Sequence, residues 1–206
     1  MTPAPRRIVL LDGSPRADSS VSLLLRELAA GAESAGAKSE TFVCHELHVL
    51  PCVACGPDAT DGYCIFHDDM DRVYAALEAA HAVVAGSPVY FDSVSGPMKL
   101  LFDRCNCVTP LVTTPEGEAF RPKWPRTRRG VFVTAHSAAH PREMAERSVR
   151  GFMKWVGARW EETIAWAHDD NVAGSVVGEP ALIERARAVG ARLATSPPLE
   201  DPGFAG

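Results

Sequence analysis

The sequence has little of what several protein classes require. Its net charge is -5, whereas a protein that binds the phosphates of a duplex needs a basic surface, so we expect no nucleic-acid partner. The longest early apolar run, residues 8–11, is too short for a membrane span or the core of a signal peptide. Without an export signal, the six cysteines are expected to be mostly thiols. We therefore expect a cytoplasmic protein with no membrane partner.

The size and composition indicate one domain. A chain of 206 residues, 46% of them hydrophobic, is long enough for one substantial core and too short for two ordinary ones. We expect a single domain over residues 1–206. Prolines 197, 198 and 202 predict a loose tail from about residue 196 onward.

Apolar runs that suit buried strands alternate with stripes that suit helices. The expected strands are residues 7–11, 41–44, 82–85, 130–134 and 163–167. Apolar residues spaced for helices begin at Val21, Met70, Ala145 and Leu182, and Ser95 is expected to cap a further helix over 95–105. The alternation predicts an α/β protein with a flavodoxin-like three-layer fold and a five-stranded parallel sheet in the order 2-1-3-4-5. Such folds bind ligands at the carboxyl ends of the strands, which directs attention to loops 12–22, 86–96 and 135–141.

Several familiar motifs are missing from the sequence. It contains no G-x-G-x-x-G, no G-x-S-x-G and no H-E-x-x-H, which argues against an ordinary dinucleotide fold, a serine hydrolase and a zinc protease. Residues 31–39 resemble a P-loop but carry an extra alanine and follow a helix. The five basic residues in 121–129 indicate either a solvated connecting segment or a binding site for an anion such as the phosphates of a dinucleotide.

The first loop has the composition of a phosphate site. Gly13 allows a tight turn after the first strand, Arg16 supplies a positive charge, and four serines lie close to the start of the next helix: Ser14, Ser19, Ser20 and Ser22. Hydroxyls, a guanidinium group and the free amides of a helix N-terminus together suit a phosphate dianion.

A set of motifs in fixed order extends this interpretation. The motifs are Gly-Ser-Pro-Arg at 13–16, Pro-Cys-Val-Ala-Cys at 51–55, Asp-Asp-Met at 68–70, Gly-Ser-Pro-Val-Tyr-Phe at 86–91, Gly-Pro-Met-Lys at 96–99 and Asp-Arg at 103–104. In these the sequence resembles the NADPH-dependent FMN reductase and iron-sulfur flavoprotein group, closely over residues 8–104 and loosely beyond. The resemblance implies an FMN whose phosphate lies on Ser14, Arg16 and Ser20. Val21 stands where the group often has threonine, so Ser19 or Ser22 is expected to replace that hydroxyl.

The second and third loops are expected to meet the flavin ring. The resemblance implies that Pro88, Val89, Tyr90 and Phe91 run beside it, whereas from the residues alone the two aromatic side chains suit a ring site and ordinary packing equally. In the third loop, backbone amides near Ser137 are expected to meet the polar edge of the flavin, and His136 is either a further contact or a solvent-facing residue.

The cysteines leave several interpretations open. Iron-sulfur members of the group carry four cysteines in a compact run, but Asp58 stands where the third would be. A 4Fe-4S cluster normally takes four thiolates, so we expect no cluster and no metal. Cys52, Cys55 and Cys64 are then redox-active, part of a zinc site with His67, or structural. Cys105 and Cys107 are expected to be packed, not paired.

These observations predict an FMN-dependent NAD(P)H oxidoreductase. NAD(P)H would reduce FMN, and the flavin would pass electrons to a small acceptor such as a quinone, another flavin or an electrophile. This division of labour fits a sequence in which no catalytic acid–base pair can be identified. The alternatives are an FMN electron-transfer protein that does not oxidise NAD(P)H and a domain that has lost its flavin. We expect a homodimer or homotetramer, with segments 86–96 and 108–124 near the interface.

Overall fold

One parallel sheet organises the molecule. The computed structural model describes residues 4–56, 63–115, 117–125, 127–137, 142–168 and 172–201. The sheet contains β1 (Arg7–Asp12), β2 (Lys38–Val43), β3 (Ala82–Pro88), β6 (Arg128–His136) and β7 (Ala158–Ala167). Its order is β2-β1-β3-β6-β7. Because these are the first to fifth strands of the sheet along the chain, the predicted order 2-1-3-4-5 is confirmed.

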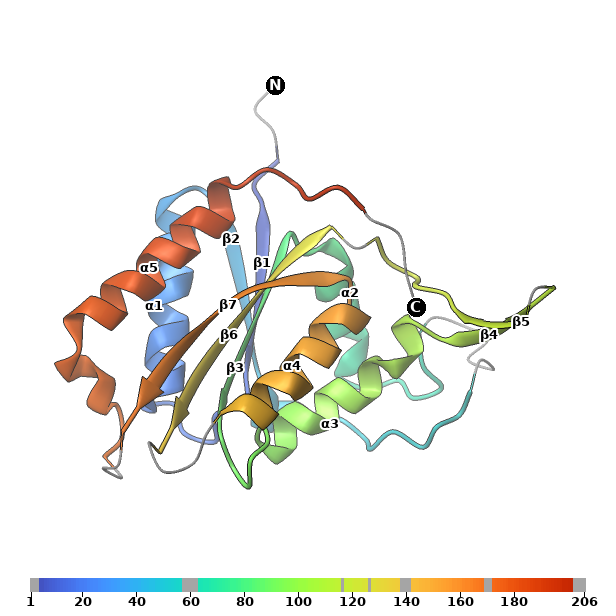
Figure 1. The fold of residues 1–206 in the computed structure, drawn as a ribbon, viewed down its shortest axis with the longest axis horizontal. Coiled ribbons are helices and arrows are strands. Elements are labelled where there is room, and N and C mark those ends of the chain that lie inside the picture. The colour runs from blue at the N-terminus through green and yellow to red at the C-terminus, as the bar shows by residue number, and fades with distance from the viewer. Residues whose placement is uncertain are drawn as a thin grey trace.

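Helices cover both faces of this sheet (Figure 1). On one face lie α1 (Ser20–Ser34) and α5 (Pro180–Thr195), and on the other lie α2 (Met70–Ala79), α3 (Gly96–Arg104) and α4 (Glu143–Trp155). Strand β1 shows why the sheet is buried on both sides. Its side chains alternate, so that Ile8 and Leu10 join the core beneath α1 and α5 while Val9 and Leu11 join the core beneath the other three helices.

The start of α3 is fastened to the loop after β1. Ser95 caps α3 as predicted, since its Oγ accepts from the Met98 N–H, and the same hydroxyl donates to the Gly13 carbonyl over 2.6 Å. A Cβ on Gly13 would lie 2.8 Å from the Met98 Cβ. Gly13 has no positive φ, so glycine is needed here because the loop approaches α3 closely and not because the turn requires a left-handed residue.

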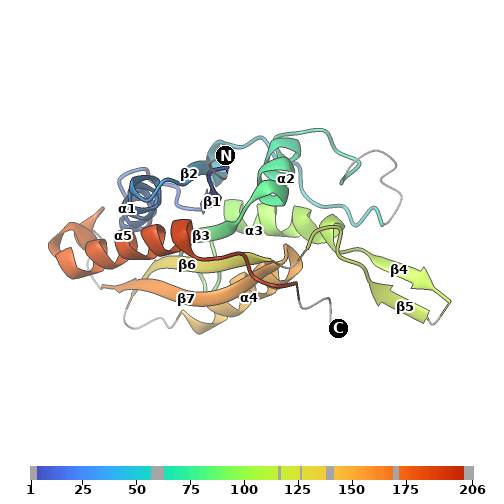
Figure 2. The same cartoon turned by 90° about the horizontal axis from the view of Figure 1, so that it is seen from above.

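Sequence reasoning missed a small antiparallel hairpin. Strands β4 (Leu111–Thr114) and β5 (Gly117–Phe120) pair with each other outside the main sheet, and Figure 2 shows the hairpin projecting from the body of the molecule. Single 3-10 turns lie at Cys44–Glu46 (η1), Cys105–Val108 (η2) and Ser175–Gly178 (η3). Within the described residues, no helix is long and apolar enough to cross a membrane.

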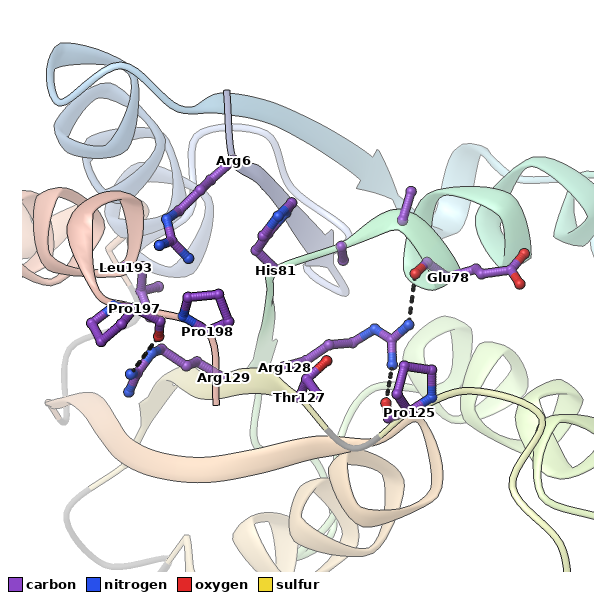
Figure 3. A pocket seen from close by; sticks show the side chains of 12 residues that line it. Arg6, Glu78, His81, Pro125, Thr127, Arg128, Arg129, Leu193, Pro197 and Pro198 are labelled. Carbon is purple, nitrogen blue, oxygen red and sulfur yellow. Dashed lines mark hydrogen bonds between the residues drawn. The ribbon is translucent and has the colours of Figure 1, made fainter. Parts of the chain in front are cut away.

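Arg128 ties together the amino-terminal edge of the sheet, beside a cavity of about 300 Å³. The side chain is buried, and it donates to the carbonyls of Glu78, near the end of α2, and Pro125 (Figure 3). It also donates to the carbonyls of Leu77 and Val156. Val156 is the C-cap of α4. A guanidinium group suits helix C-termini, whose last carbonyls lack partners within the helix and carry negative charge. Arg128 therefore fits neither interpretation of the basic run, because it is neither solvated nor at the ligand-binding edge.

Candidate functional site

Four loops surround a cavity of about 260 Å³ at the carboxyl-terminal edge of the sheet. Three of them, after β1, β3 and β6, are the loops to which the sequence directed attention, and the third is described only as far as Ser137. Most of the residues singled out from the sequence line this cavity: Ser14, Arg16, Ser19, Ser20, Pro88, Val89, Tyr90, His136 and Ser137. The fold therefore brings together side chains that are up to 123 positions apart in the chain, from Ser14 to Ser137.

Ser22 and Phe91 are outside the described lining of this cavity. The Ser22 hydroxyl is buried and donates to the Arg16 carbonyl over 3.1 Å, so it shapes the loop from behind. Phe91 is fully exposed. It lies at the tip of a tight turn closed by two hydrogen bonds between the Tyr90 and Ser93 backbones, where Phe91 and Asp92 both have positive φ. Such a conformation is strained for residues other than glycine.

The serine hydroxyls beside the cavity already hold the first loop in shape. Ser14 Oγ donates to the Arg16 carbonyl, Ser19 Oγ caps α1 by accepting from the Ser22 N–H, and Ser20 Oγ accepts from the Val176 N–H. Arg16, in contrast, is half exposed, and its one described ion pair is a long contact of 3.4 Å with Asp18. The groups best able to receive an anion are therefore the Arg16 guanidinium and the first amides of α1.

His136 presents an unused acceptor at the cavity. The residue is 8% exposed, and Nδ1 lies 2.9 Å from the Ser137 carbonyl. Because a carbonyl accepts, this contact assigns the proton to Nδ1 and leaves a lone pair on Nε2. Nε2 is buried and has no partner among the described residues. A ligand that donates a hydrogen bond there would remove the cost of burying an unsatisfied polar atom.

A fourth wall of the cavity was not predicted. It is formed by His168 and by residues 172–174, which follow the last strand. The His168 N–H donates to the His136 carbonyl over 3.0 Å. Gly174 has a φ of 66°, and a Cβ there would lie 2.9 Å from the Asp18 carbonyl oxygen. The indication in the sequence was the position of these residues alone, because they also follow the carboxyl end of a strand.

Four cysteines line a second cavity, about 430 Å³ in volume. They are Cys52, Cys55, Cys64 and Cys107, and apolar side chains such as Phe66 and Trp155 complete much of its wall. All six cysteines fall in described segments and are free thiols, and Cys105 is packed in the core as expected. Within the described residues, no group of three or more His, Cys, Asp or Glu side chains is arranged to hold a metal ion. Asp58 lies outside those residues, so the absence of a cluster stays a prediction.

The fold and the cavity define a class of protein. A five-stranded parallel sheet in this order, with a serine-rich loop after its first strand and a cavity at its carboxyl edge, is a flavodoxin-like α/β domain. A solved archaeal flavodoxin has the same fold, with a TM-score of 0.54 at 11% identity over 91% of this chain and 96% of its own.

The family follows from the sequence comparison. The model of the family described as NADPH-dependent FMN reductase matches residues 6–168, and this chain belongs to that family. The family resemblance predicted from the motifs is thereby confirmed. The chain is accordingly a member of an FMN-dependent oxidoreductase family.

Relatives with curated names include archaeal iron-sulfur flavoproteins. One from Methanocaldococcus jannaschii is 32% identical over 98 residues, which are 48% of this chain and 51% of the relative. Another, from Archaeoglobus fulgidus, is 28% identical over 183 residues, or 88% of this chain and 76% of the relative. The match therefore spans only about half the length of the Methanocaldococcus relative.

Proposed function

We propose that this protein is an FMN-dependent NAD(P)H oxidoreductase that passes electrons from a nicotinamide, through FMN, to a small acceptor such as a quinone, another flavin or an electrophile. One observation carries the proposal. The cavity combines a serine-rich loop that carries Arg16 with a buried acceptor on His136 that has no partner among the described residues, and FMN presents both a terminal phosphate and a ring N–H donor. Bound FMN supplies the redox chemistry.

The residues of the cavity have separate tasks in this proposal. Arg16 and the first turn of α1 hold the phosphate, since a guanidinium group and free helix amides both favour a dianion. Val89 and Tyr90 lie against the ring, and the Val89 N–H is already used in a hydrogen bond to the Ala135 carbonyl, which fixes the position of this loop. His136 Nε2 accepts from a ring N–H and so orients the ring.

Stopped-flow mixing tests the proposal. The FMN-loaded protein is mixed anaerobically with NADPH or NADH, and rapid loss of the oxidised flavin absorbance is expected with at least one of them. Dithionite is the control, because it reduces any competent flavin. If dithionite bleaches the flavin and neither nicotinamide does, the protein is an electron carrier and the proposed enzyme activity is wrong.

A further inference from the structure

A buried carboxylate lies directly behind the wall of the cavity. Asp12 ends β1 and is 6% exposed, and its Oδ1 accepts from the Ser14 N–H over 2.9 Å. Ser14 lines the cavity at the carboxyl edge, and it also lines a smaller one of about 220 Å³ behind it, which Asp12, Arg26 and His45 share. One residue therefore separates the Asp12 carboxylate from the space assigned to the phosphate.

Among the described residues, no side chain forms an ion pair with Asp12. From α1, Arg26 faces it but donates to the Ala17 carbonyl, and from η1, His45 donates through Nδ1 to the Ser14 carbonyl. Glu46 lines the same small cavity. Burial raises the pKa of Asp12, and the nearby Ser22 hydroxyl, the hydrogen bond from the Ser14 N–H and the charges of Arg26 and His45 only partly offset this.

The neighbouring thiol is affected by the same carboxylate. Cys44 is buried beside Asp12, and burial followed by the Asp12 charge raises the pKa of this thiol to about 12. Cys44 therefore stays neutral and contributes no charge to this region. Asp12 is left as a buried acid beside a site for anions.

We propose that Asp12 is a positioning residue that couples phosphate binding in the cavity to the uptake of a proton. This inference rests on the proposed function, because FMN is the phosphate carrier concerned. As a carboxylate, Asp12 orients the loop through Ser14 but repels a dianion on the other side of that residue. As a carboxylic acid, it keeps an oxygen that accepts from Ser14 and no longer repels the phosphate.

The sign of the coupling follows from the charges. A bound dianion disfavours the carboxylate and so raises the pKa of Asp12 above its already raised value in the free protein. Between these two pKa values FMN binding takes up a proton, and the affinity that depends on Asp12 falls as pH rises. Above both values the affinity is lowest, because the carboxylate then stays charged beside the phosphate.

Asp12→Asn isolates the charge, since asparagine keeps the Oδ1 acceptor for Ser14. FMN is titrated into flavin-free wild type and variant from about pH 5 to about pH 8.5, and quenching of flavin fluorescence gives Kd. The phosphate of FMN itself titrates near pH 6, and its repulsion by the Asp12 carboxylate is weaker below that pH, so the Arg26→Gln variant described below is needed to assign the transition to Asp12. We expect the variant to bind FMN about tenfold more tightly at the alkaline end, with the ratio approaching one at the acid end.

Three controls separate this coupling from a structural effect. Riboflavin lacks the phosphate, so its affinity ratio should stay near one at every pH. Glu33→Gln removes the same charge at the far end of α1, where Glu33 is exposed, and should leave the pH profile unchanged. Arg26→Gln removes a cation that lowers the pKa of Asp12, so it should move the transition to higher pH even if Asp12→Asn does not fold.

The possible failures are distinguishable. If wild type binds FMN and the ratio between Asp12→Asn and wild type does not change with pH, the coupling is wrong and the proposed function stands. If neither protein binds FMN at any pH, the proposed function is wrong and the inference falls with it.

Discussion

Side chains around the cavity divide into those that shape the loop and those available to a ligand. Ser14, Ser19 and Ser20 hydrogen bond within the protein, while Arg16 is half exposed and has one long ion pair among the described residues. Arg16→Ala should therefore weaken FMN binding by roughly 1.5–3 kcal/mol, or about tenfold or more, since one charge-assisted contact is lost. Fluorescence titration with FMN measures the loss.

Riboflavin provides the matched control for this variant. It has no phosphate, so Arg16→Ala should bind it as wild type does. An FMN affinity that is unchanged in the variant would mean that the phosphate lies elsewhere, and the assignment of the first loop would then be wrong.

For single residues, the sequence predicted which residue types form the site but not which way their side chains point. The composition of the first loop indicated an anion site, but it could not show that the Ser22 hydroxyl turns back to the Arg16 carbonyl. It also could not show that positive φ angles at Phe91 and Asp92 leave Phe91 fully exposed. Both outcomes depend on local backbone geometry that residue type does not determine.

Among the elements, the loop before α2 is pinned to the end of α3 by a buried ion pair. Arg104 Nη1 lies 2.5 Å from Asp68 Oδ2, and the two side chains are 0% and 4% exposed. Arg104 also donates to the Leu50 carbonyl, while Asp68 accepts from the N–H groups of Leu50 and Met70. The pair thereby orders the wall that carries Cys52 and Cys55 and fixes the start of α2.

Asp68→Asn should destabilise the protein by about 3–5 kcal/mol, because it leaves the Arg104 charge buried without a partner. The melting temperature should fall by roughly 10 °C. Asp103→Asn is the matched control, since Asp103 pairs with Lys99 on the surface, and exposed pairs contribute about 1 kcal/mol or less. Equal losses in the two variants would contradict the role assigned to the buried pair.

Acid should reduce the difference between wild type and Asp68→Asn. Burial raises the pKa of Asp68, but hydrogen bonds from Arg104, Leu50 and Met70 outweigh burial, so the pKa is lowered overall. The stability that Asp68 contributes is present above the pKa of an unfolded aspartate, about 3.9. It is lost as pH falls through the lower pKa of the folded protein.

The regular elements were predictable where periodicity was strong. All five strands of the sheet and the five helices were expected near their observed positions, because long apolar patterns override small local preferences. The hairpin of β4 and β5 escaped detection. Its strands have four residues each and include polar residues such as Thr113 and Glu118, so neither strand gives a clear alternating pattern.

For the whole molecule, the prediction concerns its oligomeric state. Apolar surface is exposed on the two segments expected at an interface, 86–96 and 108–124. It belongs to the side chains of Tyr90, Phe91, Leu111 and Phe120. A two-stranded hairpin has little stability alone in water, and a second copy would cover this surface. We expect light scattering of the FMN-loaded protein at micromolar concentration to give a dimer or a tetramer.

Two substitutions test the interface. Leu111→Asp should shift the mass toward the monomer, whereas Met144→Asp, at an exposed apolar position on α4, should not. A wild-type monomer with fully bound FMN would show that the flavin needs no partner subunit and would remove the reason for placing these segments at an interface.

The two edges of the sheet have different roles, and this difference determines which parts of the domain can be altered. Arg128 joins the ends of α2 and α4 at the amino-terminal edge, while the cavity lies across the sheet, roughly 20 Å away along a strand of seven residues. Loops at the carboxyl edge can therefore be exchanged without touching the arginine that fastens the helices. We therefore expect loops transplanted from relatives to change what the cavity binds with little loss of stability.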